Sequence, residues 1–586
     1  MCRILGFVEN NPDKKNLDNM QEVLKPGGPD NYGFYLDRDV ALGHRRLSII
    51  DLSPNANQPM EFDNLVISYN GEVYNFKEIK NDLKEYEFKT NSDTEVILKA
   101  FHKWGTDAVK RFRGMFAIAL WDKKQKKLFL IRDRNGVKPL YYYYDEKVFI
   151  FASEIKALVK HPKFQKRIDK KSAVLFFQLG FIPTPYSIFE NCKKLENASI
   201  LEFDGKNIKI SKYWDFLKYA TLPEIQKSEE EVLEELESIL KDSFKLRMIA
   251  DVEVGLFLSG GIDSSLLASI LSREYNLKTF TIGFKDKKFN EADIAKKTAK
   301  ILHTDHTEYY FDISDMLNLL PKMVEIFDEP FADSSIFPTY LVSKLASQRL
   351  KVVLSADGAD ELFWGYPSNF KNARRYYKYQ KFLFLKNLLS VFGNKKIKKK
   401  YYMLQKDMFK YKLATRYKIF PDEFNIHVEL KNTLKCDECL KCAFLFDYKY
   451  FLTDDVLVKV DRSTMANSLE AREPFLDQNI AEYALRLPSS LKYKNGKTKY
   501  ILRKLLSKYL PDEIVNLPKK GFSIPIKYWL RNELKENVLE VINSSTYLDT
   551  LLNKNKIIDT FYKTGNRTSE VWSMYVFNLW YEKYVK

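Results

Sequence analysis

The segment Ser259–Ser265, which reads Ser-Gly-Gly-Ile-Asp-Ser-Ser, constrains the fold of this 586-residue chain more than any other stretch. The apolar run Val254–Leu258 before it predicts a buried strand, and the residues after it predict a helix. Two glycines let the backbone approach an anion closely, and a helix N-terminus supplies free N–H groups. The combination predicts a pyrophosphate-binding loop in an α/β domain, in which Asp263 holds Mg²⁺ beside the phosphates.

Strands and helices alternate on both sides of this loop. Ser228–Glu231 is a capping box that opens a helix. Further strands are predicted over 279–284 and 352–354, with a helix over 291–302 between them. We therefore expect an α/β doubly wound parallel-sheet domain, followed by a helical C-terminal part.

The first 210 residues follow a different pattern. Short apolar runs, each bounded by turn residues, predict strands over 65–69, 115–120, 128–131 and 148–151. This pattern favours an α+β sandwich of packed antiparallel sheets. We expect a first domain over 1–210, a linker over 211–227 and a second domain over 228–586.

Charge and hydropathy exclude several classes of protein. The 95 Lys and Arg residues exceed the 78 Asp and Glu residues, for a net charge of +17. That charge is dispersed rather than clustered in a stripe, so a nucleic-acid partner is not expected. No apolar run approaches the ~18 residues that span a bilayer. An acid at Glu9 interrupts any signal-like stretch, so we expect a cytoplasmic chain without a membrane partner.

Cys2 is a candidate N-terminal nucleophile. Removal of the initiator Met, expected when the second residue is small, would leave Cys2 with a free α-amine. That amine can act as the base for its own thiol, so no separate His is needed. A Cys at this position is usually incidental, and the interpretation depends on its context.

Two groups of polar residues supply that context. The Asn70 amide with the Gly71 N–H could form an oxyanion hole, although an ordinary Asn-Gly hairpin is the alternative. Arg46–Asp51 and Ser92–Glu95 add a cation and an anion that could hold the α-carboxylate and α-ammonium of an amino acid. The alternatives are a surface pair and a helix cap.

The order and spacing of these residues resemble a class II glutamine amidotransferase domain. The resemblance implies an N-terminal nucleophile fold, in which Cys2 attacks the glutamine side-chain amide, forms a thioester and frees ammonia. It also implies a set of glutamine-binding residues, which are Arg46, Asn70, Gly71, Glu72 and Asp93.

Two positions depart from that family. Arg3 stands where the family usually has Gly, and Lys25–Asp30 (Lys-Pro-Gly-Gly-Pro-Asp) replaces the usual Arg-His-Arg-Gly-Pro-Asp. The loss of basic residues bears on the glutaminase rate and on loop closure more than on the chemistry itself.

The Ser259–Ser265 loop resembles the PP-loop of enzymes that split ATP between its α and β phosphates. The resemblance implies that Asp263 and Asp360 bind the metal. It also implies an ATP-binding set, which is Phe257, Ser259, Gly260, Gly261, Asp263, Ser264, Ser265, Ile282, Ser355 and Ala356.

Two further segments match this class of enzyme. In Ser355–Phe363, Asp357 stands where several members have a Glu that is tied to activating the acceptor or deprotonating ammonia. In Asn495–Arg503, Lys499 would neutralise charge on the leaving pyrophosphate. For Lys499 and Arg503 the alternative is an exposed i,i+4 basic pair.

With four more segments the resemblance covers nearly the whole chain, and it is to the glutamine-dependent asparagine synthetase family. Glu473 stands where that family commonly has Val, beside the expected acceptor region, and bears on substrate choice. The four segments are Asp328–Ser334, Val460–Ser463, Glu470–Asp477 and Lys520–Phe522.

The resemblance implies that the chain makes asparagine from aspartate, Mg-ATP and glutamine through a β-aspartyl-AMP intermediate, with an internal ammonia path. A homodimer is left open. One alternative is the same architecture amidating another carboxylate, such as a sugar uronate in polysaccharide biosynthesis. The others are a tRNA-modifying PP-loop enzyme and a non-catalytic scaffold.

Five cysteines are too few for a disulfide scaffold in a chain of this length. Cys436, Cys439 and Cys442 form a Cys-x₂-Cys-x₂-Cys run that could bind zinc or part of an iron–sulfur cluster. Three ligands fall short of four, which favours packing on one helix face.

Overall fold

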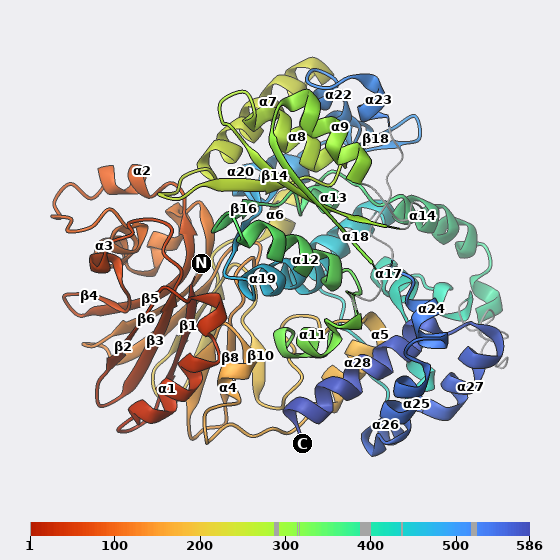
Figure 1. The fold of residues 1–586 in the computed structure, drawn as a ribbon, viewed down its shortest axis with the longest axis horizontal. Coiled ribbons are helices and arrows are strands. Elements are labelled where there is room, and N and C mark those ends of the chain that lie inside the picture. The colour runs from red at the N-terminus through yellow and green to blue at the C-terminus, as the bar shows by residue number, and fades with distance from the viewer. Residues whose placement is uncertain are drawn as a thin grey trace.

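A computed structural model describes residues 2–285, 292–312, 315, 317–386, 400–434, 438–516 and 524–586. Its N-terminal part, red to orange in Figure 1, is built of sheets. A second sheet region with helices, mainly green, lies beside it, and blue helices form the C-terminal part.

The N-terminal part contains two six-stranded antiparallel sheets. Their strand orders are β10-β8-β9-β1-β3-β2 and β12-β11-β7-β6-β5-β4. Ile4 and Leu42 of the first sheet pack against Val66, Trp121 and Leu130 of the second, which makes the pair a sandwich as expected. The strands are β1 (Arg3–Val8), β2 (Asn31–Leu36), β3 (Val40–Arg46), β4 (Met60–Phe62), β5 (Leu65–Val73), β6 (Gly114–Asp122), β7 (Lys127–Arg132), β8 (Tyr141–Tyr144), β9 (Phe149–Ala152), β10 (Cys192–Lys194), β11 (Ser199–Phe203) and β12 (Ile208–Lys212).

Six helices accompany these sheets. Ser92 caps the third of them by accepting a hydrogen bond from the Thr94 N–H, as the sequence predicts. The helices are α1 (Lys14–Glu22), α2 (Phe76–Asn81), α3 (Asp93–Trp104), α4 (Ile155–Leu158), α5 (Lys170–Leu179) and α6 (Phe216–Thr221).

A five-stranded parallel sheet follows, in the order β15-β14-β13-β16-β17. Every described pair in it is parallel, so the expected parallel-sheet domain is confirmed. Its last strand comes from far along the chain and pairs with β16 at the edge. The strands are β13 (Val254–Phe257), β14 (Lys278–Phe284), β15 (Asp305–Phe311), β16 (Val352–Leu354) and β17 (Glu470–Arg472).

The helices around this sheet begin with α7, which Ser228 and Glu231 open with the predicted capping box. The sequence predicts another helix over 291–302. Its expected first residue, Glu291, lies outside the described residues. The helices up to residue 486 are α7 (Glu229–Leu246), α8 (Ile262–Leu271), α9 (Ala292–Leu302), α11 (Leu320–Ile326), α12 (Ile336–Ser347), α13 (Ala359–Leu362), α14 (Pro367–Gln380), α17 (Met408–Arg416), α18 (Cys439–Phe446), α19 (Leu457–Met465) and α20 (Gln478–Arg486).

After residue 486, the described residues form helices and the hairpin of β18 (Tyr493–Lys494) and β19 (Lys497–Thr498). Among the described residues, we find no helix long and apolar enough to cross a membrane. The C-terminal helices are α21 (Ser489–Lys492), α22 (Tyr500–Leu506), α23 (Asp512–Val515), α24 (Ile526–Arg531), α25 (Lys535–Asn543), α26 (Thr546–Leu551), α27 (Lys554–Thr564) and α28 (Thr568–Tyr584).

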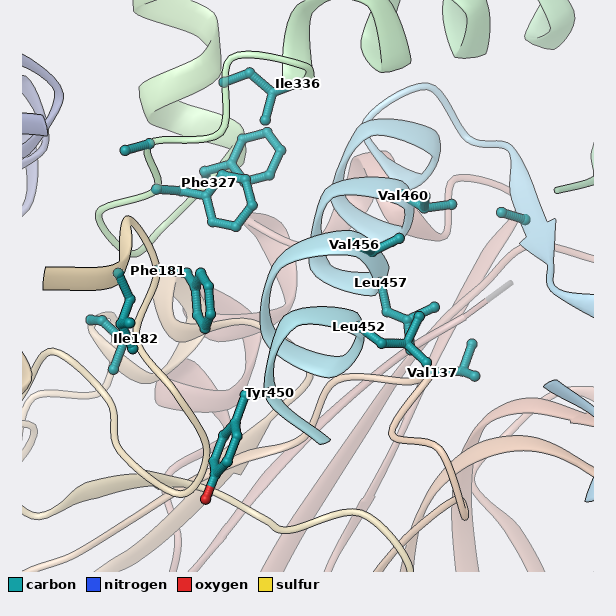
Figure 2. Close-up of a cluster of buried hydrophobic side chains, with 14 of the residues drawn as sticks. Val137, Phe181, Ile182, Phe327, Ile336, Tyr450, Leu452, Val456, Leu457 and Val460 are labelled. Carbon is teal, nitrogen blue, oxygen red and sulfur yellow. The ribbon is translucent and has the colours of Figure 1, made fainter. Parts of the chain in front are cut away.

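One hydrophobic cluster joins the two architectures. Figure 2 shows Leu452, Val456, Leu457 and Val460 on the π-helix η6 (Asp447–Val456) and on α19 that continues it. Side chains from the N-terminal part, such as Val137, belong to the same cluster. Because apolar burial stabilises in proportion to area, this shared core holds the two parts together.

The change of architecture falls between β12 and α7. Helix α6 lies within the expected linker, and it packs against α20 of the second part. We retain 1–210, 211–227 and 228–586 as a proposed domain division.

Candidate functional site

The candidate nucleophile Cys2 immediately precedes β1. Arg3 pairs with Arg45 in the antiparallel ladder, so one further step of the register sets Cys2 opposite Arg46. Burial raises the pKa of the Cys2 thiol to about 11, although the Leu47 N–H and Arg46 oppose that shift. The resting thiol is therefore neutral and needs a base when it reacts.

Asn70 and Gly71 lie in the middle of β5, where they pair with Ala117 and Phe116 of β6. The alternative of an Asn-Gly hairpin turn is therefore wrong. Asn70 is fully buried, and neither atom of its amide has a hydrogen-bond partner among the described residues. A Cβ on Gly71 would lie 2.0 Å from the Met115 carbonyl oxygen, so only Gly fits. A buried amide without partners is available to a bound group.

Arg46 and Asp93 are buried, so the alternative of a surface pair is wrong. The helix cap is present, because Ser92 caps the helix that begins at Asp93. The Arg46 guanidinium donates to the Ser53 carbonyl oxygen at 2.8 Å. The Asp93 carboxylate accepts from the Tyr69 hydroxyl at 2.8 Å and the Val73 N–H at 3.0 Å. Burial raises the pKa of Asp93 to about 6 despite these donors. Both charges are thus held in fixed positions.

Glu72 faces the second part of the chain. Its carboxylate lies 3.4 Å from the Arg472 guanidinium, which also donates to Glu470 at 2.6 Å. Burial, with Glu470 and Asp93 nearby, holds the pKa of Glu72 well above its usual range. Strand β17 therefore forms one wall of the Cys2 region.

A second candidate site is a cavity of about 470 Å³ at the carboxyl ends of β13, β14 and β16. In open parallel sheets this edge is where ligands bind. The candidate residues that line it are Phe257, Ser259, Asp263, Ser264, Ile282, Ser355, Ala356, Asp357 and Asp360.

Three candidate residues of the Ser259–Ser265 segment are not among the described residues that line the cavity. Gly260 has φ +71°, and a Cβ there would lie 2.9 Å from Ile294, so Gly is required. Gly261 is the N-cap of α8, and Ser265 is buried inside that helix. They shape the loop, while Ser259 and Ser264 present their hydroxyls to the cavity.

Lys499, at the start of α22, is not itself among the described residues that line the cavity, but it pairs with two carboxylates that do. Its Nζ forms ion pairs with Asp263 and, at 2.6 Å, with Asp360. Burial opposes the charged form, yet the two carboxylates raise the pKa of Lys499 above its ordinary value. Arg503 instead donates to the Thr498 and Val515 carbonyl oxygens. The alternative of an exposed basic pair is therefore wrong.

The paired carboxylates of Asp263 and Asp360 fit a magnesium ion that takes its remaining ligands from phosphates and water. Among the described residues, no group of three or more His, Cys, Asp or Glu side chains could hold a metal by itself. Both carboxylates already converge on one cation, the Lys499 ammonium, which shows that they can share a positive partner.

Comparison with known proteins identifies the family of the chain. The family model described as "Asparagine synthase" matches residues 235–582, and the model described as "Glutamine amidotransferase domain" matches residues 1–214. The chain belongs to the asparagine synthase family. It is 33% identical to "Asparagine synthetase [glutamine-hydrolyzing] 1" of Bacillus subtilis (strain 168), over 99% of this chain and 96% of that protein. It is 37% identical to "Putative asparagine synthetase [glutamine-hydrolyzing] 2" of Methanocaldococcus jannaschii, over 79% of this chain and 98% of that protein.

The structure links the two departures from the family pattern. A Cβ on Gly27 would lie 2.8 Å from Cγ of Arg3, so the Arg3 side chain occupies the space beside this loop. Arg3 is fully buried and forms ion pairs with Glu154 and, at 2.9 Å, with Asp461 of the second part. Arg3 thus joins the region beside this loop to the second part of the chain.

Sequence reasoning missed some residues of the nucleotide cavity. Lys459 lines it and donates to Asp333 at 3.0 Å and to the Ser335 hydroxyl at 2.8 Å. Tyr366 and Phe451 also line it. Asp333 was within a family-like segment, whereas nothing local distinguishes Lys459 from other helical lysines.

The cysteine run is only partly described. Cys436 lies outside the described residues, as do Lys520–Phe522. Cys439 is a free, buried thiol at the start of α18, and Cys442 is disulfide-bonded. Cys439 contributes to a small hydrophobic cluster with Tyr376 and Tyr411.

Proposed function

We propose that the chain makes asparagine from aspartate, using ammonia released from glutamine and energy from Mg-ATP. The observation that carries the proposal is the place of β17. Glu470 on this strand lies close enough to Cys2 to raise the pKa of its thiol. The carbonyl oxygen of Arg472, on the same strand, accepts a hydrogen bond from the N–H of Ser355, which lines the nucleotide cavity. One short strand thus connects a glutamine site with an ATP site.

The first reaction takes place at Cys2. Its thiol attacks the side-chain amide carbon of glutamine while its own α-amine takes the proton. The Asn70 amide and the Gly71 N–H stabilise the negative oxygen of the tetrahedral intermediate. The C–N bond then breaks, which releases ammonia and leaves a glutamyl thioester for water to hydrolyse.

The second reaction takes place in the cavity. A carboxylate oxygen of aspartate attacks the α-phosphorus of ATP, and pyrophosphate leaves, which gives β-aspartyl-AMP. Asp263 and Asp360 would hold the Mg²⁺, whose charge neutralises the phosphates when it is bound. The Lys499 ammonium offsets negative charge on the leaving group. Ammonia then attacks the activated carbon, and AMP departs.

The test is to supply aspartate, glutamine and Mg-ATP and to measure asparagine and AMP together. We expect both products in equal amounts. A parallel panel of uronic acids tests the sugar-amidating alternative. AMP formation with a uronate and none with aspartate would overturn the choice of acceptor but keep the two-site scheme.

Asn70→Ala should slow glutamine-dependent synthesis by on the order of 10²–10³-fold, because it removes one donor to the oxyanion. Synthesis from ammonium chloride should be unchanged, since that route bypasses Cys2. The matched control is Asn64→Ala, in the turn just before the same strand, where the side chain donates a hydrogen bond to Asp122 at 2.8 Å. Equal losses in both variants would contradict the assignment of Asn70.

A further inference from the structure

A line of buried charged side chains runs through the contact between the two parts of the chain. Arg3, next to Cys2 in sequence, lies 2.9 Å from Asp461. The ammonium of Lys138 lies 4.0 Å from the same carboxylate. Lys138 also lies close enough to Glu473 to favour the ionised form of that carboxyl. The line therefore extends from the neighbour of Cys2 to Glu473.

Glu473 stands where this line reaches the nucleotide cavity. It directly follows β17, and Arg472 before it accepts a hydrogen bond from the Ser355 N–H at 2.8 Å. Asp357, which lines the cavity, disfavours the ionised form of Glu473. Glu473 is not itself among the described residues that line the cavity. It therefore lies behind the cavity wall, on the side of the N-terminal part.

The two ends of β17 face the two sites. Glu470 lies close enough to Cys2 to raise the pKa of its thiol. Glu473 is three residues further along, which is about 10 Å at roughly 3.3 Å per residue. A nitrogen released at Cys2 and consumed in the cavity would pass along this strand, and Glu473 lies at its far end.

Glu473 has the properties of a proton acceptor. It is buried, and its Oε2 has no hydrogen-bond partner among the described residues. Burial raises the pKa of Glu473 to about 8; Lys138 opposes the shift, while Asp357, Asp461 and Asp133 add to it. At pH 7 such a carboxyl is mostly protonated, and the ionised fraction can take a proton and later return it.

We propose that Glu473 takes a proton from ammonium behind the cavity wall, on the side of the N-terminal part, and so delivers ammonia to the activated acceptor. An N–H bond of ammonium breaks and an O–H bond forms on Oε2. The freed lone pair then attacks the acyl carbon, and the C–O bond to AMP breaks with its electrons leaving on AMP. The new amide nitrogen loses its surplus proton to the Asp357 carboxylate. Both carboxyl groups return their protons to water when the products leave.

This inference rests on the proposed function, and its test uses ammonium chloride so that Cys2 is not involved. Amide formation is measured at pH 7 and pH 9, at one total ammonium concentration, for the wild type and Glu473→Gln. We expect the rate of amide formation by Glu473→Gln to fall at least about tenfold at pH 7. This is a modest share of what a general base contributes. It should approach the wild type at pH 9, where water already supplies free ammonia. Glu473→Asp, which keeps a carboxyl, should recover part of the rate at pH 7.

The inference would be overturned if Glu473→Gln showed the same ratio of the amide-formation rate at pH 7 to the rate at pH 9 as the wild type. If that variant does not fold, Glu473→Val replaces it with the residue that the family commonly has, and the same loss at pH 7 is expected. A wild-type ratio in Glu473→Val would equally overturn the inference. A wild-type chain that hydrolyses glutamine but amidates no acid would overturn the proposed function, and this inference with it.

Discussion

Cys2→Ala should abolish the use of glutamine while synthesis from ammonium chloride continues at the wild-type rate. The thiol is the only nucleophile that we place in the first site, and Ala keeps a small side chain there. The loss should reach the background of uncatalysed amide hydrolysis, because without the thiol no thioester forms. Release of glutamate from glutamine and formation of asparagine from ammonium chloride are measured on the same preparation.

The matched control for this variant is Cys192→Ala. Cys192 is also a free thiol of the N-terminal part, but it is buried in β10. This strand forms an edge of the sheet, and β8 and β9 separate it from β1, the strand that follows Cys2. We expect it to keep glutamine use. Loss of both nitrogen sources in Cys2→Ala would refute the separation of the two sites.

Asp263→Asn should stop AMP formation while glutamine hydrolysis persists. The substitution keeps the volume of the side chain but removes the charge that pairs with Lys499 and that we assign to Mg²⁺. We expect a loss on the order of 10²–10³-fold, comparable to removal of one preorganised electrostatic group in other enzymes. AMP and glutamate are measured in parallel with saturating aspartate.

Asp305→Asn is the control for Asp263→Asn. Asp305 begins β15 at the edge of the same sheet and pairs with Arg349 at 2.6 Å on the surface. An exposed ion pair contributes only about 0–1 kcal/mol, so AMP formation should be nearly unchanged. Unaltered AMP output in Asp263→Asn would remove Asp263 from the metal site.

Local pattern predicted those elements whose cause lies within a few residues. The Ser228 capping box starts α7 as expected, because its two hydrogen bonds join residues three apart. The apolar run Val254–Leu258 forms β13, since a strand buried on both faces needs continuous apolar side chains. The glycine loop after it and the start of α8 follow from the same short-range rules.

Local pattern failed at Asn70 and Gly71. An Asn-Gly pair favours a hairpin turn, yet both residues lie inside β5. Pairing with β6 along the full strand outweighs that preference, and the close approach of Met115 makes Gly necessary there. Propensity is a weak guide wherever neighbouring strands determine the backbone.

A thiol near the chain start and a glycine loop that we propose for phosphates can both be recognised from the residues alone. How these two features are connected depends on long-range packing. Arg3 meets Asp461, Lys499 meets Asp263, and Glu473 ends the strand between the sites. These partners are hundreds of residues apart or on separate elements, and no periodicity or cap encodes such a distance. They come together because burial of apolar surface brings the two parts into one core.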